Sequence, residues 1–146
     1  MMVNLRVLRD IEPVLSEQAA NGVEIRRAFP SESSVIADWV REYINPNWGV
    51  VCEVALEQTP PDCFIAFQKN PTGEPTVLSN ENLVGFACYD VVTGGVFGPS
   101  GVREDQQETD VGTALLLCCM HAMAAEEHKQ AVIGWSGMTV GFSGNL

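Results

Sequence analysis

Apolar residues recur at helical spacing in the first half of the chain. In residues 33–44 they form one stripe: Val35, Ile36, Trp39, Val40, Tyr43 and Ile44. This spacing predicts an amphipathic helix that begins among the serines after Pro30 and ends at Asn45-Pro46. Residues 111–127 are apolar on nearly all sides, which predicts a long buried helix. A shorter helix is expected within residues 8–20.

Five shorter runs have the alternating or continuously apolar character of β-strands. They are residues 23–28, 63–68, 83–92, 96–102 and 131–135. The stretch between the second and third runs contains two prolines and a glycine, which is typical of a long hairpin loop. Pro99 interrupts the fourth run and predicts a bulge or a splayed edge, because proline has no N–H to donate. The order strand, helix, three antiparallel strands, helix, strand predicts an α+β fold with a mixed sheet.

Length and charge narrow the class of protein. The 146 residues suit one domain with a real core, so we expect a single domain over residues 1–146. Eight basic and 19 acidic residues give a net charge of −11. Because nucleic-acid binding relies on clustered lysine and arginine, no nucleic-acid partner is expected. The longest nearly apolar run, residues 114–125, is too short to cross a bilayer, so no membrane partner is expected either.

The five cysteines show no repeated spacing, and no secretory leader is visible at the N-terminus. The adjacent Cys118 and Cys119 would point to different faces of a helix and cannot simply bridge each other. We interpret the cysteines as reduced core thiols of a cytoplasmic protein. One helix cannot direct Cys118, Cys119 and His121 at the same ion, so no metal site is expected.

The sequence lacks several common catalytic and nucleotide-binding motifs. Residues 134–138 come close to the nucleophile elbow G-x-S-x-G but fail at Met138, and both histidines precede Ser136 where that fold requires one after it. The phosphate-binding patterns G-x-x-x-x-G-K-[ST] and G-x-G-x-x-G do not occur. The remaining candidate is the strand–loop–helix segment 94–125, where a helix N-terminus attracts phosphate and an open strand edge can pair with an amide-bearing ligand such as coenzyme A. Many such units bind no ligand, so on these grounds both alternatives stay open.

Several segments, taken in order, resemble the GNAT N-acetyltransferase superfamily. They are FGPSGV at 97–102, VGTALLL at 111–117 and AVIGW at 131–135, most similar to a bacterial branch that reads FGPTGV, GxALLLACL and AIIGG. Shorter pieces at 23–28, 52–55, 63–66 and 83–90 agree, so the resemblance covers residues 20–137.

The resemblance implies a mixed, mostly antiparallel sheet flanked by helices and splayed between the strands at 96–102 and 131–135. Acetyl-CoA would lie in this split, with its pantetheine on the first strand and its diphosphate on the following loop and helix N-terminus. The implied cofactor-binding residues are Phe97, Gly98, Gly101, Val102, Gln107, Glu108, Thr109, Asp110, Val111, Gly112 and Thr113. No metal is implied.

The implied reaction is direct transfer of the acyl group to an amine of a small molecule or a protein. A backbone N–H near Val102 would steady the oxyanion. A general base would deprotonate the ammonium group, and Glu53 is the candidate for this catalytic role. A solvated loop acid is the alternative interpretation of Glu53.

The loop departs from the pattern of the superfamily. It reads QETDVG at 107–112 where the branch has RGxGIG, so Glu108 and Asp110 stand at positions expected to be glycine. Each carboxylate near a diphosphate would cost about 1–3 kcal/mol. Alternatively, Asp110 is a helix N-cap and Glu108 a solvated loop acid.

The two ends of the chain also differ from the pattern of the superfamily. Residues 1–21 form an N-terminal extension, and the divergent tail 138–146 does not resemble the usual C-terminal helix, which is missing. Its loss would expose apolar sheet surface, so a homodimer is expected. Two hypotheses follow: an acyl-CoA-dependent N-acyltransferase, or a catalytically degenerate GNAT-fold dimer that serves as a binding or interaction module.

Overall fold

The computed structural model describes residues 2–91, 94–107, 109–126 and 130–133. In these residues six strands form one sheet, in the order β1-β6-β5-β4-β3-β2. The strands are β1 (Met2–Asn4), β2 (Val23–Arg27), β3 (Cys63–Gln68), β4 (Leu83–Tyr89), β5 (Val96–Val102) and β6 (Gln130–Ile133). The α-helices are α1 (Glu12–Ala20), α2 (Ser33–Tyr43), α3 (Trp48–Leu56) and α4 (Val111–Ala125).

Strands β2 to β5 pair antiparallel in chain order. The helix α4 then returns the chain so that β6 lies parallel to β5, with Val96 opposite Val132 and Phe97 opposite Ile133. The expected α+β fold with a mixed, mostly antiparallel sheet is therefore confirmed. The expected split beside β5 and the expected loss of a C-terminal helix depend on residues after 133, which lie outside the described residues.

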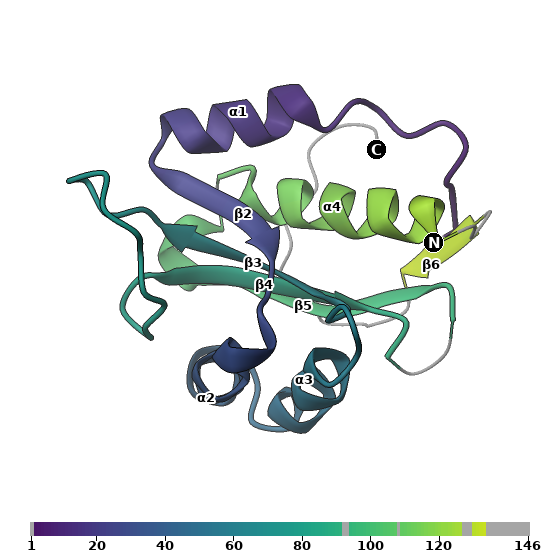
Figure 1. Ribbon diagram of the computed structural model, residues 1–146. Coiled ribbons are helices and arrows are strands. Elements are labelled where there is room, and N and C mark those ends of the chain that lie inside the picture. Colours follow the sequence, from purple (N-terminus) through teal and green to yellow (C-terminus); the bar gives the residue numbers. More distant parts are fainter. Residues whose placement is uncertain (1, 92–93, 108, 127–129, 134–146) are drawn as a thin grey trace.

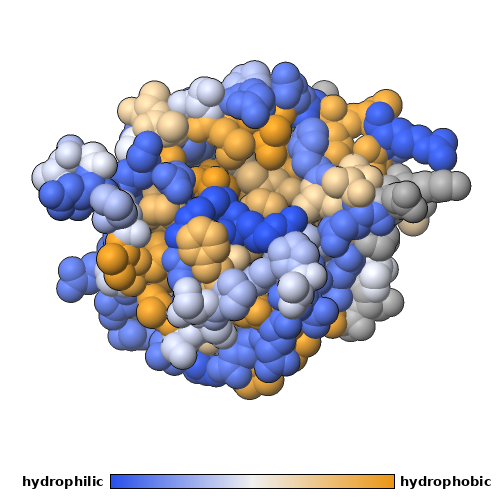
Figure 2. Space-filling view, in the orientation of Figure 1, coloured by the Kyte–Doolittle hydropathy of each residue, from blue (hydrophilic) through white to orange (hydrophobic). Residues whose placement is uncertain are grey.

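Helices cover both faces of the sheet: α1 and α4 lie on one face, and α2 and α3 on the other (Figure 1). Each face has its own core. One cluster of buried side chains joins α4 to the sheet, and a second joins α2 and α3 to the opposite face. On the face seen in Figure 2, hydrophilic residues form a band across the middle with apolar areas above and below it. None of the described helices is long and apolar enough to cross a bilayer.

One strand and one α-helix of the described residues are absent from the sequence prediction. The strand β1, only three residues long, lies at the sheet edge and pairs antiparallel with β6. The helix α3 begins just after the predicted stop at Asn45-Pro46. Its sequence, WGVVCEVAL, is rich in valine and apolar on most sides, so it offers no helical stripe.

The strand β5 is continuous, and the interruption predicted at Pro99 takes the form of a bulge. Ala87 pairs with Ser100 and Tyr89 pairs with Phe97. Between these two pairs the chain advances by two residues on β4 and by three on β5. The extra residue of β5 falls at Gly98-Pro99, as expected where a strand must absorb a residue without an N–H.

Candidate functional site

The edge of β5 that faces away from β4 is the centre of the candidate site. The Arg103 N–H donates to the Val84 carbonyl at 2.7 Å. Because backbone groups alternate in direction along a strand, the N–H and C=O of Val102 point away from β4. The Val102 carbonyl accepts a hydrogen bond from Gln107 Nε2 at 3.3 Å. The Val102 N–H is thus directed toward the outer edge of β5.

Two glycines of the FGPSGV segment have structural roles of their own. Gly98 has φ of +119°, a backbone conformation that L side chains rarely adopt. At Gly101, an added Cβ would lie 2.8 Å from Ile44 Cγ2, so the end of α2 packs directly on the backbone of β5. The side chains of Phe97 and Val102 are buried in the core beneath α4. Of these residues, Val102 has its main-chain groups directed away from β4, whereas Gly101 faces β4 and Phe97 lies opposite Ile133 of β6.

The loop after β5 leads into the N-terminus of α4. Asp110 occupies the N-cap position as expected, but within the described residues its side chain makes no capping hydrogen bond. Thr109 Oγ1 donates to the Gln106 carbonyl at 2.6 Å, and Val111 to Thr113 are buried. Glu108 lies outside the described residues. The first N–H groups of a helix have no partner inside it, so this turn can receive an anion.

Charge around this turn opposes such an anion. Residues 103–110 contain one basic and four acidic side chains, which gives 1 − 4 = −3. The guanidinium of Arg103 donates to Asp105 Oδ1 at 2.6 Å and also to the Leu83 carbonyl at 3.3 Å. The same hydrogen bond lowers the pKa of Asp105. The backbone at the start of α4 can therefore receive an anion, whereas the side-chain charge of the loop disfavours one.

Glu53 lies on α3, so the alternative interpretation of it as a loop acid is wrong. Its half-exposed carboxylate accepts a hydrogen bond from Arg41 Nη2 of α2. That bond raises the pKa of Arg41 further above its ordinary value. The Arg41 side chain crosses α3 at Gly49, where any Cβ would clash with it. The structure thus places Glu53 in an ion pair with Arg41 between α3 and α2.

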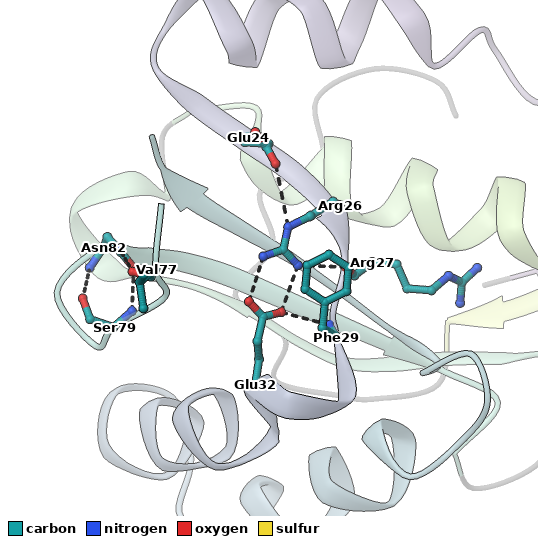
Figure 3. Close-up of polar contacts among 8 residues, drawn as sticks. All are labelled: Glu24, Arg26, Arg27, Phe29, Glu32, Val77, Ser79 and Asn82. Atoms are coloured by element: carbon teal, nitrogen blue, oxygen red, sulfur yellow. Dashed lines mark hydrogen bonds and ion pairs between the residues drawn. The ribbon is translucent and has the colours of Figure 1, made fainter. Parts of the chain in front are cut away.

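A second polar centre lies at the end of β2 (Figure 3). Arg26 donates to both carboxylate oxygens of Glu32, at 2.9 and 2.8 Å, and its guanidinium carbon lies 4.2 Å from the ring centroid of Phe29. A hollow of about 370 Å³ opens beside Arg26 and is lined by the 69–76 loop. Because Glu32 neutralises Arg26, we interpret this ion pair as structural: it links β2 to the start of α2.

The five cysteines are unpaired and buried, and three of them meet. Cys52 on α3, Cys63 on β3 and Cys88 on β4 are 11 and 25 residues apart in sequence. Sequence spacing points only to Cys118, Cys119 and His121 as possible metal ligands, so it misses this group. The one available signal was that Cys63 and Cys88 each fall in a predicted strand, which does not specify their register.

Comparisons with known proteins support the fold. No family model matches the chain, and no curated protein matches it. Among solved structures, the chain is similar to a GCN5-related glucosamine N-acetyltransferase region of a fungal multi-domain GH3 beta-N-acetylglucosaminidase, with a TM-score of 0.67 and 10% identity over 92% of this chain. It is also similar to a candidate acetyltransferase from Pyrococcus horikoshii, with a TM-score of 0.51 and 21% identity over 71% of this chain.

The chain spans only 17% of the fungal protein and 35% of the Pyrococcus chain. At these identities the likeness shows the fold alone. The chain therefore has the α+β fold found in these structures, a four-stranded antiparallel sheet flanked by helices and extended by β6 and β1.

Proposed function

We propose that the protein is an acyl-CoA-dependent N-acyltransferase that transfers an acetyl group to an amine of a small molecule or a protein. The carrying observation is the backbone of β5, whose Val102 N–H points away from β4 just before the chain enters the N-terminus of α4. The same fold in two structures described above as acetyltransferases supports the proposal.

Each part of the site has a defined task in this proposal. Acetyl-CoA, when bound, supplies the acyl thioester. The N–H groups of the first turn of α4 would hold the diphosphate, and the Val102 N–H would donate a hydrogen bond to the acyl oxygen. The deprotonated amine would form the new C–N bond as the C–S bond breaks, and coenzyme A would leave as its thiol after taking up a proton. Gln107 fixes the loop through its hydrogen bond to the Val102 carbonyl. Glu53 would act as general base only after its carboxylate leaves Arg41.

The second candidate is a non-catalytic GNAT-fold module, and the charge of the loop favours it. An acid at Asp110, at the N-cap of α4, repels the phosphate that the helix N-terminus attracts. The ion pair of Glu53 with Arg41 also leaves the candidate base occupied.

Calorimetric titration with acetyl-CoA separates the two candidates. We expect weak binding by the wild type and binding about tenfold tighter in Glu108→Gly and in Asp110→Gly, because a carboxylate at intermediate dielectric costs about 1–3 kcal/mol. Glu104→Gln, an acid of the same loop outside the glycine positions, is the control and should change the affinity much less.

No binding at millimolar acetyl-CoA, by the wild type or by the double variant, would reject the acyltransferase proposal. Tight binding that the two glycine substitutions fail to improve would show that loop charge does not limit affinity.

We also propose that the protein is a cytoplasmic homodimer. The reduced, buried cysteines support the compartment. For the dimer, Val50 and Val54 lie one turn apart on α3 with 61% and 42% of their surface exposed, which offers an apolar contact. Sedimentation across micromolar concentrations should show a species of twice the chain mass, and a monomer throughout would disprove the dimer.

A further inference from the structure

Three thiols converge inside the core between α3 and the sheet. The sulfur atoms of Cys52, Cys63 and Cys88 all lie within 4.8 Å of one another. All three side chains are fully buried, in the cluster that joins α2 and α3 to the sheet. They come from three different elements, so tertiary packing alone brings them together.

Two of the thiols, those of Cys63 and Cys88, lie on adjacent strands at a position where cross-strand side chains come closest together. Cys63 and Cys88 are directly opposite each other in the β3–β4 register. The Tyr89 N–H donates to the Asp62 carbonyl at 3.1 Å, so the hydrogen bonds flank the cysteine pair and do not join it. Cross-strand side chains approach most closely at such non-hydrogen-bonded pairs. The third thiol, Cys52, comes from α3, which packs on β3 and β4.

The spacing is close to what a metal ion needs. With metal–sulfur bonds of about 2.3 Å, three sulfurs arranged around one ion are about 4 Å apart. The observed spread of up to 4.8 Å therefore requires a movement of less than about 1 Å, within reach of small side-chain rotations.

We propose that Cys52, Cys63 and Cys88 form a three-thiolate site that binds a soft d¹⁰ cation, with Cu(I) as its ion. Thiolate sulfur selects Cu(I) and zinc over harder cations. Structural zinc sites are almost always four-coordinate. Among the described residues the group has three donors, which suits the lower coordination number of Cu(I). The nearby Cys119 belongs to the core on the other face of the sheet and donates to the Ala87 carbonyl.

This inference goes beyond the proposed acyl transfer and is tested without coenzyme A. Cu(I) is titrated anaerobically against a colorimetric Cu(I) chelator, using both native protein and protein refolded with the ion, because the site is enclosed. We expect one Cu(I) per chain. Binding releases thiol protons to the buffer, so the affinity should fall as pH is lowered.

Substitutions identify the ligands. Cys63→Ser and Cys88→Ser should each weaken Cu(I) binding at least a hundredfold, whereas Cys118→Ser, a buried cysteine outside the group, should bind like the wild type. Circular dichroism checks that each variant folds. Cu(I) should also raise the melting temperature of the wild type and of Cys118→Ser but not that of Cys63→Ser.

X-ray absorption of the loaded wild type gives a readout that does not depend on any variant folding. Three sulfur neighbours at a single short distance are expected. Two or fewer sulfurs, no retained Cu(I) in either preparation, or full binding by folded Cys63→Ser would overturn the proposal.

Discussion

Glu32, a few residues after β2, has a largely buried carboxylate with several hydrogen-bond donors around it. Its side chain is 14% exposed, it accepts two hydrogen bonds from Arg26, and it accepts a third from the Phe29 N–H at 2.9 Å. Burial by itself would raise the pKa of Glu32, but these hydrogen bonds outweigh it and lower the pKa below the ordinary value of 4.5. A group with a lowered folded-state pKa stabilises the protein when it is ionised.

We expect Glu32→Gln to lower the free energy of unfolding by about 1–2 kcal/mol at pH 7, since hydrogen bonds to a charged partner are lost. The wild-type advantage should be complete above pH 4.5, the unfolded-state pKa, and disappear as pH falls through the lower folded-state pKa. Urea unfolding between pH 7 and pH 3 measures this difference.

Glu24→Gln is the matched control for this prediction. Glu24 lies 3.7 Å from Arg26 Nε and is 43% exposed, so its loss should cost less than about 0.5 kcal/mol at every pH. A Glu32→Gln deficit that persists undiminished at pH 3 would contradict the assignment.

At the scale of elements, the first residues of the chain complete the core. The strand β1 pairs with β6, and Val3 and Leu5 are buried in the cluster that packs against α4. Two residues further along, Val7 is 69% exposed. Residues 2–21, predicted to be part of an N-terminal extension, therefore supply an edge strand and core side chains.

Leu5→Ala and Val7→Ala test whether the N-terminal segment is part of the core. Leu5→Ala should lower the free energy of unfolding by about 2–4 kcal/mol through lost burial and a cavity. Val7→Ala should change it by less than about 0.5 kcal/mol, as is usual for exposed positions. Chemical denaturation measures both values. Equal, small effects would mean that Leu5 contributes little to the core.

At the scale of the whole molecule, the net charge of −11 acts on every anionic ligand that approaches. Coenzyme A carries its charge on phosphates, so the protein and its proposed co-substrate repel each other. Salt screens this repulsion, because the Debye length falls from about 30 Å at 0.01 M to about 8 Å at 0.15 M.

We therefore expect the affinity for acetyl-CoA to rise several-fold between 0.01 M and 0.15 M salt, the opposite of the usual behaviour of phosphate-binding proteins. Calorimetry at several salt concentrations checks this. An uncharged acetyl-pantetheine thioester, which lacks the phosphates, should show almost no salt dependence. An affinity for acetyl-CoA that falls with salt would mean that basic groups dominate the binding face.

Local patterns predicted α1, α2, α4 and the strands β2 to β6 to within a few residues. The helix α2 was found because one-sided burial leaves a period in the sequence, and α4 was found because its apolar run is long enough to be a buried helix. The same reasoning failed for α3, whose residues are apolar on most sides, and for β1, which is too short to carry a period. Both elements form because partners distant in sequence accept them: α2 packs on α3, and β6 pairs with β1.

Part of the candidate site could likewise be predicted from the sequence, and part of it depends on tertiary structure. The sequence located the strand, the loop and the helix start, and it identified the acids at 108 and 110. The direction of the Val102 N–H depends on the register of β5 against β4, and a shift by one residue would reverse it. The pairing of Glu53 with Arg41 depends on how α2 and α3 pack, and Gly49 is the residue that makes room for it.

The sequence by itself determined the fold class, the order of most elements and the acidic character of the proposed diphosphate loop, because these are properties of consecutive residues. Only the tertiary structure decided which side chains meet. Cys52, Cys63 and Cys88 come together because a non-hydrogen-bonded register places two of them opposite each other and α3 lays the third above them. The spacing of these cysteines in the sequence does not predict their contact, since each thiol is positioned by a different element.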